Sequence, residues 1–275
     1  MESISELRNI CQSTRPSIFT DFLSALYYRI SIYFSWVFIK LGFSANQVTV
    51  FSGFTAAIGG VLISFDQPIY VFLGGLCFHF FSIFDMCDGE VARYRGTGGV
   101  KGHFLDWYMH FLTPTFFMVG LFFASYDSLP SDFFMLIAVV AVFIPILDKS
   151  IESAGWTVII WTRMRNFNSG ERHREESTQH NLESRFQNSE PAFYSSWFWR
   201  RFRFLSLIPF QDHWAPTLLM LLALFAYMME PFLFEVPYTV AWLLYTGVIG
   251  PFYLWWRVRR LIVDDNLTKA YRKIF

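Results

Sequence analysis

Six long apolar stretches, separated by polar segments, dominate the chain. Each lies within or above the roughly 17–25 residues that a helix needs to cross the hydrocarbon core of a bilayer. They cover residues 46–65, 69–93, 102–125, 131–162, 214–230 and 236–262. The pattern predicts an all-α integral membrane protein with six transmembrane helices, organised as a single membrane domain over residues 1–275. The first four spans, residues 46–162, form its predicted catalytic part, and residues 214–262 hold spans five and six.

Residues 20–41 form a further apolar stretch of a different kind. Arg29 and Lys40 interrupt it, and a seventh crossing would place the N-terminus on the side opposite to the one that the charges indicate. We therefore predict an amphipathic helix that lies in the cytoplasmic membrane interface.

Basic residues fall almost entirely on one side of the predicted spans. The turns on the other side contain no Lys or Arg: residues 66–68, 125–132 and 230–237. The basic side holds the turn between spans two and three, the polar segment 163–213 and the C-terminal residues 257–273. Because Lys and Arg accumulate on the cytoplasmic side, both termini, the loop 163–213 and the turn between spans two and three are predicted to be cytoplasmic.

The composition is that of a membrane protein, and the charge balance gives no support to one class of partner, nucleic acid. The chain is 54% hydrophobic and only 16% charged, outside the usual range of soluble domains. Lys plus Arg and Asp plus Glu each number 22, so a net charge of zero gives no basis for nucleic-acid binding. Membrane lipid is the predicted partner. The three cysteines, Cys11, Cys77 and Cys87, lack metal-ligand spacing and are predicted to be free thiols.

Polar residues gather where span two ends and span three begins. Those on span two fall on one stripe at 3.6 residues per turn: Asp85, Asp88, Gly89 and Ala92. Span three carries Asp106 and His110 at i and i+4. A glycine-rich turn between the spans allows the chain to fold back, so that these side chains surround one small volume.

Carboxylates inside a membrane span are costly unless they line a wet cavity, pair with one another or hold an ion. A divalent cation would relieve the repulsion among three of them, and oxygen ligands favour Mg²⁺, Mn²⁺ or Ca²⁺. Two such ions would suit in-line displacement at phosphorus. A hairpin held by salt bridges is the alternative, but it explains one Asp–Arg pair and not three carboxylates. A transporter would instead be expected to carry its carboxylates near the bilayer midplane.

These residues resemble the DxxDGxxAR, eight residues, GxxxD signature of the CDP-alcohol phosphatidyltransferase family, with Asp85, Asp88, Gly89, Ala92, Arg93, Gly102 and Asp106 at the fixed positions. A second likeness lies at Asn46 and Thr49, where the family often has Pro-Asn-x-x-Thr and this chain has Ala45. Both residues would also serve as helix-start residues without any ligand.

The resemblance implies a homodimeric membrane enzyme of phospholipid biosynthesis. It would transfer a substituted phosphate group from a CDP-alcohol to an acceptor hydroxyl and release CMP, using Mg²⁺ or Mn²⁺, with two ions expected. Implied metal ligands are Asp85, Asp88 and Asp106. Residues implied near the CDP moiety are Asn46, Thr49, Asp85, Gly89, Ala92, Arg93 and Gly102. The donor is expected to be CDP-diacylglycerol; a soluble CDP-alcohol with a lipid or glycan acceptor is the alternative.

His110 departs from the family, which has a fourth aspartate at this position. Three interpretations stay open: the imidazole is the general base that takes the acceptor proton, together with Asp106 in the catalytic group; it is a nitrogen ligand of the second metal ion; or the site is weakened, which would make the protein a catalytically silent scaffold. Among the other histidines, His103 is set apart because it lies beside the motif.

A second group of ionisable residues lies within span four. Asp148 and Glu152 share a helix face at i and i+4, with Lys149 beside them. Ionisable residues inside a span are candidates for function, and these three would bind the polar acceptor. The alternative is an internal cluster of Lys and carboxylates that stabilises the dimer or kinks the helix beyond Pro145.

Overall fold

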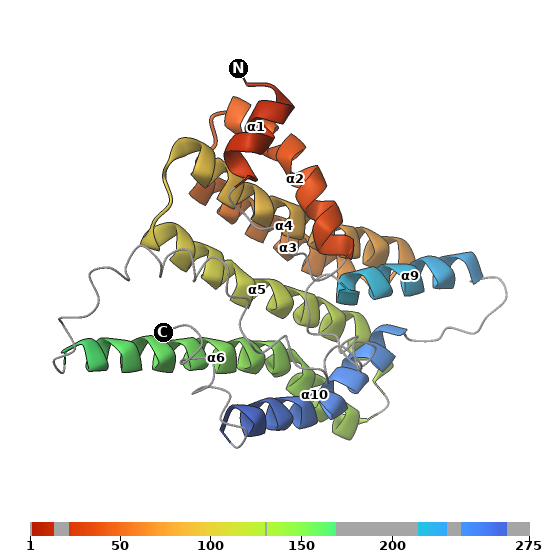
Figure 1. Cartoon of the computed structure of the whole chain (residues 1–275). Coiled ribbons are helices and arrows are strands. Elements are labelled where there is room, and N and C mark those ends of the chain that lie inside the picture. Colours follow the sequence, from red (N-terminus) through yellow and green to blue (C-terminus); the bar gives the residue numbers. More distant parts are fainter. Residues whose placement is uncertain (1, 14–21, 130, 169–213, 230–237, 263–275) are drawn as a thin grey trace.

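The computed structural model describes residues 2–13, 22–129, 131–168, 214–229 and 238–262 (Figure 1). These residues form eight α-helices and one 3-10 turn, with no strand among them. The predicted all-α class is therefore confirmed. The elements are α1 Ile4–Cys11, α2 Phe22–Lys40, α3 Ala45–Ile63, α4 Pro68–Arg95, α5 Val100–Ser125, η1 Tyr126–Ser128, α6 Asp132–Asn168, α9 Trp214–Met229 and α10 Tyr238–Ile262.

Four helices, α3 to α6, are long and apolar enough to cross a membrane. They coincide with the first four predicted spans, apart from shifts of a few residues at their ends. Predicted spans five and six fall on α9 and α10, which are helical, but the six-span count stays a prediction because these two do not meet the same criteria within the described residues. Helix α2 occupies the predicted interfacial stretch, whose place in the membrane is likewise a prediction. Helix α6 continues to Asn168, into the predicted loop 163–213, and residues 169–213 lie outside the described part of the chain.

Helix α5 runs through the centre of the molecule (Figure 1). Helix α3 packs between α4 and α5, and α4 also contacts α1, α2 and α9. On the other side of α5, α6 packs along α10. The sequence neighbours α4 and α5 therefore both pack on α3, and the start of α3 lies beside the turn that joins them.

Glycines bring α3 close to α5. A Cβ atom built on Gly60 would lie 2.5 Å from the carbonyl oxygen of Phe116, and Gly120 faces Gly60 from α5. Small residues at such crossings let helix backbones approach each other within a membrane. This contact lies near the C-terminal ends of both helices, whereas their first turns meet where a Cβ added to Gly102 would lie 3.4 Å from Asn46 Oδ1.

A buried carboxylate ties the N-terminal helices to α4. Glu90 has 0% exposure, and it accepts hydrogen bonds from Gln12 Nε2 at 2.7 Å, Ser31 Oγ at 2.7 Å and Ser35 Oγ at 2.6 Å. Because a buried charge needs such donors, α1 and α2 are held against the last turns of α4. Helix α1 is itself fixed by a capping box between Ser3 and Glu6.

Candidate active site

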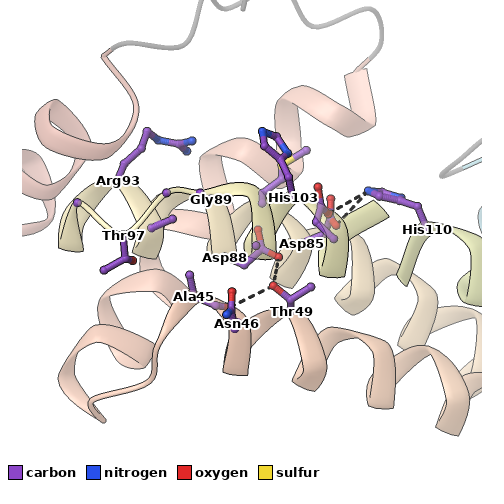
Figure 2. Close-up of a pocket in the computed structure, with 17 residues that line it drawn as sticks. Ala45, Asn46, Thr49, Asp85, Asp88, Gly89, Arg93, Thr97, His103 and His110 are labelled. Atoms are coloured by element: carbon purple, nitrogen blue, oxygen red, sulfur yellow. Dashed lines mark hydrogen bonds and ion pairs between the residues drawn. The ribbon is translucent and has the colours of Figure 1, made fainter. Parts of the chain in front are cut away.

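The cavity beside the turn that joins α4 to α5 has a volume of about 620 Å³, and the turn itself, from Gly96 to Gly99, lines it. Figure 2 shows its walls, with residues of α3 facing those of α4 and α5. Ten of its lining residues were singled out in the sequence: Asn46, Thr49, Asp85, Asp88, Gly89, Ala92, Arg93, Gly102, Asp106 and His110. The structure therefore brings together the whole predicted donor and metal group, although these residues come from three helices. His103 also lines the cavity.

Local chain features place these residues. Helix α4 ends at Arg95 and is capped by Gly96, whose φ of 63° is the left-handed conformation that glycine adopts most readily at a helix end. The short turn that follows leads to Val100, where α5 begins. Helix α3 starts at a capping box formed by Ser44 and Gln47, so its first turn, with Asn46, meets the cavity.

Three side chains form a compact donor group at the inner end of the cavity. One ligand atom each from Asp85, Asp106 and His110 lies within 4.8 Å of the others. His110 Nε2 is 3.3 Å from Asp85 Oδ1 and 3.4 Å from Asp106 Oδ1, and Figure 2 shows the imidazole directed at Asp85. Two carboxylates and an imidazole are suitable donors for a divalent metal ion. The residues present therefore fit the metal that the sequence predicts.

Asp88 stands apart from this donor group. Thr49 Oγ1 donates a 2.6 Å hydrogen bond to Asp88 Oδ2, which links the first turns of α3 to α4 (Figure 2). Asp88 is 9% exposed and lines the same cavity. Thr49, predicted near the CDP moiety, contacts a predicted metal ligand in this structure.

Arg93 forms the wall nearest the N-terminal helix. Its Nε donates a 2.6 Å hydrogen bond to the carbonyl oxygen of Cys11, at the end of α1. Its guanidinium lies over Gly89, where an added Cβ would come within 3.2 Å of Nη1. The absence of a side chain at Gly89 therefore leaves the floor of the cavity open beside a cation.

Sequence reasoning missed the contribution of α1 and of Glu90. Glu90 lies on the face of α4 turned away from the cavity, and its carboxylate within an apolar span was a visible signal. Its donors Gln12, Ser31 and Ser35, and the Cys11 carbonyl on Arg93, lie far away in the sequence and could not be identified from helix periodicity. The cysteines Cys11, Cys77 and Cys87 are free, as predicted.

Asp148, Lys149 and Glu152 are not among the residues that line this cavity. Arg257 of α10 pairs with Asp148 through Nη1 and lies 3.7 Å from Glu152 through Nη2, while Lys149 Nζ is 3.3 Å from Glu152. Two cations thus balance two carboxylates between α6 and α10. Their predicted role in acceptor binding stays a prediction, and Arg257 is the member of the group that the sequence analysis did not identify.

Known proteins are similar in sequence to the part of the chain that forms the cavity. The sequence model of the CDP-alcohol phosphatidyltransferase family matches residues 43–167. The phosphatidylinositol phosphate synthase of Mycobacteroides abscessus is 38% identical over 68 residues, which are 25% of this chain and 30% of that protein. The phosphatidylinositol phosphate synthase of Mycobacterium tuberculosis is 37% identical over 86 residues, which are 31% of this chain and 39% of that protein.

The matched stretch spans about a third of the length of these curated relatives. The family match, however, includes every cavity-lining residue that the sequence signature supplies, from Asn46 to His110. Residues 43–167 of this chain are therefore a CDP-alcohol phosphatidyltransferase domain.

Proposed function

We propose that the protein is a membrane-embedded transferase that moves a substituted phosphate group from a CDP-alcohol to an acceptor hydroxyl and releases CMP. One observation carries this proposal. The donor group of Asp85, Asp106 and His110 lines the same cavity as Gly89 and Arg93. A metal-binding donor group and an open, cationic surface for phosphate are the two parts that displacement at phosphorus requires.

Phosphate would be held by backbone and by Arg93. Residues from the first turns of both α3 and α5 line the cavity, including Asn46 and Gly102. Helix N-termini favour anions, because their backbone N–H groups have no partner within the helix. Gly89 and Ala92 leave room for the nucleotide to approach α4.

The chemistry involves one bond formed and one bond broken at phosphorus. The acceptor oxygen attacks the phosphorus that carries the alcohol, and the bond from this phosphorus to the oxygen bridging it to CMP breaks. The proton of the hydroxyl passes to Asp106 or His110, the two groups of α5 in the donor cluster. A bound Mg²⁺ or Mn²⁺ would supply positive charge to the phosphate oxygens. Asp85, Asp106 and His110 are suited to hold it, and Asp88 is the further ligand that the family pattern implies.

We further propose CDP-diacylglycerol as the donor. The relatives are named phosphatidylinositol phosphate synthases, which supports a lipid product and a phosphorylated polyol as acceptor. An apolar groove of about 400 Å³ adjoins the cavity at Asn46 and is lined by side chains suited to acyl chains: Phe43, Val50, Phe51, Phe54 and Leu105. A homodimer, implied by the family, and a second metal ion belong to the same proposal.

The cytoplasmic orientation is also part of the proposal, and it rests on the distribution of Lys and Arg. Helix α1 contacts the last turns of α4 beside the cavity, which supports an N-terminal helix on the same side of the membrane as the active site. Helix α2 bonds to Glu90 and packs on Phe80 and Phe84, so these contacts run from the middle of α4 towards its C-terminal end. These contacts support its predicted place in the interface rather than along the full span.

The test is CMP release by the full chain purified in detergent, with Mg²⁺ or Mn²⁺. Donors are CDP-diacylglycerol and soluble CDP-alcohols, each combined with inositol phosphate, glycerol phosphate or serine, and the lipid product is identified by mass spectrometry. Asp85→Asn should reduce release to background. Asp127→Asn, the same change at an exposed residue of η1, should leave the rate unchanged. If folded protein releases no CMP from any donor, the transferase proposal fails and the silent scaffold takes its place.

A further inference from the structure

His110 stands where the family pattern has a fourth aspartate. Its distances to Asp85 and Asp106 can be compared with those of a hydrogen bond and with those between two ligands of one metal ion. Nε2 lies 3.3 Å from Asp85 Oδ1 and 3.4 Å from Asp106 Oδ1. A charge-assisted hydrogen bond between nitrogen and carboxylate is about 2.7–2.9 Å long. Both separations exceed this range by several tenths of an ångström, so the two contacts are longer than short charge-assisted hydrogen bonds.

The same separations suit three ligands of one ion. Two donor atoms about 2.1 Å from a metal are about 3.0 Å apart at a right angle and about 3.4 Å apart at the tetrahedral angle. The two N···O distances fall between these values. The imidazole nitrogen thus already has, from each carboxylate oxygen, the spacing that two ligands of one small cation require.

The surroundings fix the imidazole in this direction. His110 and Asp106 are one turn apart on α5, and Phe81 of α4 packs against the imidazole edge to face, with ring centroids 6.0 Å apart. Asp88, by contrast, is engaged by Thr49 at 2.6 Å and is not part of the compact group. The nitrogen therefore lies closer to the centre of the donor group than the carboxylate of Asp88 does.

We propose that His110 binds the divalent ion through Nε2, together with Asp85 and Asp106, and that this mixed donor set prefers a first-row transition ion such as Mn²⁺ to Mg²⁺. Mg²⁺ is bound by oxygen ligands and water, whereas imidazole suits transition metals. The inference rests on the proposed function for the identity of the site, but not on turnover. With Nε2 bound to the ion, the acceptor proton passes to Asp106.

The test uses full-length protein without a polyhistidine tag, freed of metal and titrated with Mn²⁺. Pulsed electron paramagnetic resonance should detect coupling of bound Mn²⁺ to an imidazole ¹⁴N nucleus. His110→Asp should abolish this coupling while restoring an all-oxygen site. His103→Gln is the matched control, because His103 lines the same cavity outside the donor group, and it should keep the coupling.

Competition between the two metals gives the second readout. The ratio of Mn²⁺ to Mg²⁺ affinity should fall by on the order of tenfold or more in His110→Asp, since changes even to residues around a metal ligand alter affinity by roughly 10–100-fold. Bound Mn²⁺ without ¹⁴N coupling, a coupling that survives in His110→Asp, or no Mn²⁺ binding at millimolar concentration would each overturn the proposal.

The two proposals fail in different ways. CMP release with Mg²⁺ but no ¹⁴N coupling to bound Mn²⁺ would leave the transferase standing and remove His110 from the ligand set. A His110-dependent coupling without CMP release from any donor would establish the metal site and refute the transferase.

Discussion

Ser35 Oγ donates a 2.6 Å hydrogen bond to Oε2 of Glu90, and this pair joins α2 to a fully buried carboxylate on α4. Hydrogen bonds to charged groups contribute roughly 1.5–3 kcal/mol. Ser35→Ala should lower the free energy of unfolding by this amount, measured by denaturant unfolding in detergent. Ser150→Ala removes an exposed hydroxyl that bonds only within its own helix, and it should change stability by less than about 0.5 kcal/mol. Equal effects of the two changes would contradict a structural role for the Glu90 network.

Thr49 and Asp88 provide a prediction about the metal site. Thr49→Val removes the donor to Asp88 while keeping the side-chain shape, and Thr49→Ser keeps the hydroxyl. If Asp88 is a ligand, Thr49→Val should weaken metal affinity by roughly 10–100-fold, measured as the Mn²⁺ concentration that half-saturates binding. Thr55→Val, at a partly exposed threonine of α3 that bonds within its own helix, should have no effect. Unchanged affinity in Thr49→Val would indicate that Asp88 does not depend on this hydrogen bond.

The crossing of α3 and α5 should not tolerate a methyl group. In Gly60→Ala the new Cβ would lie 2.5 Å from the Phe116 carbonyl oxygen, so the helices must move apart at a cost of about 1–3 kcal/mol. The melting temperature in detergent should fall accordingly. Gly98→Ala is the control, because no atom lies within 4 Å of its added Cβ. A melting temperature equal to that of the wild type would show that this contact is looser than the structure indicates.

Variants of the charged cluster between α6 and α10 can distinguish a role in acceptor binding from a structural role. Arg257→Met leaves two carboxylates without their α10 partner, and breaking such a buried pair costs roughly 3–5 kcal/mol, which thermal unfolding would detect. Among the described residues, the ion pair that Lys149 forms is with Glu152, and Lys149→Met removes it. If the cluster binds acceptor phosphate, Lys149→Met should raise the KM for the acceptor and leave the KM for the donor unchanged. Unchanged acceptor KM with lowered stability would favour the internal cluster.

Cys11 gives a pH-dependent measure of whether α1 is docked. Burial, and then the nearby Glu90 carboxylate, raise the pKa of the Cys11 thiol to about 11. The neutral thiol is therefore favoured in the folded state, and its stabilising contribution is lost as the pH rises from the thiol's usual pKa through 11. Maleimide labelling of Cys11 followed by mass spectrometry should be slow at pH 8 and should accelerate above pH 10. Labelling at pH 8 as fast as in denatured protein would show that α1 is undocked.

Helix periodicity was sufficient to place much of the site. The spacing of Asp85, Asp88 and Gly89 predicted that they share one stripe of a helix. The glycine-rich turn before Asp106 predicted that the acidic residues of the two helices meet. Spacing and turn composition are both local properties of the chain, so the sequence reveals them. The bond from Thr49 to Asp88 and that from Arg93 to Cys11 depend on how helices pack, and the second joins residues 82 positions apart. Charge alone marked Asp148 as unusual, and the same signal at Glu90 was missed. Their partners Arg257 and Ser35 come from other helices and have no spacing that reveals them.

The carbonyl of Cys11 also bears on what counts as an independently folding unit. The family match begins at residue 43, yet Arg93 inside it bonds to residue 11, and the donors to Glu90 come from residues 12, 31 and 35. A fragment trimmed to the shared domain would expose a carboxylate built for burial and would lose an anchor of the arginine that lines the cavity. The stretch that the family model covers and the stretch that these contacts join are therefore different lengths of polypeptide.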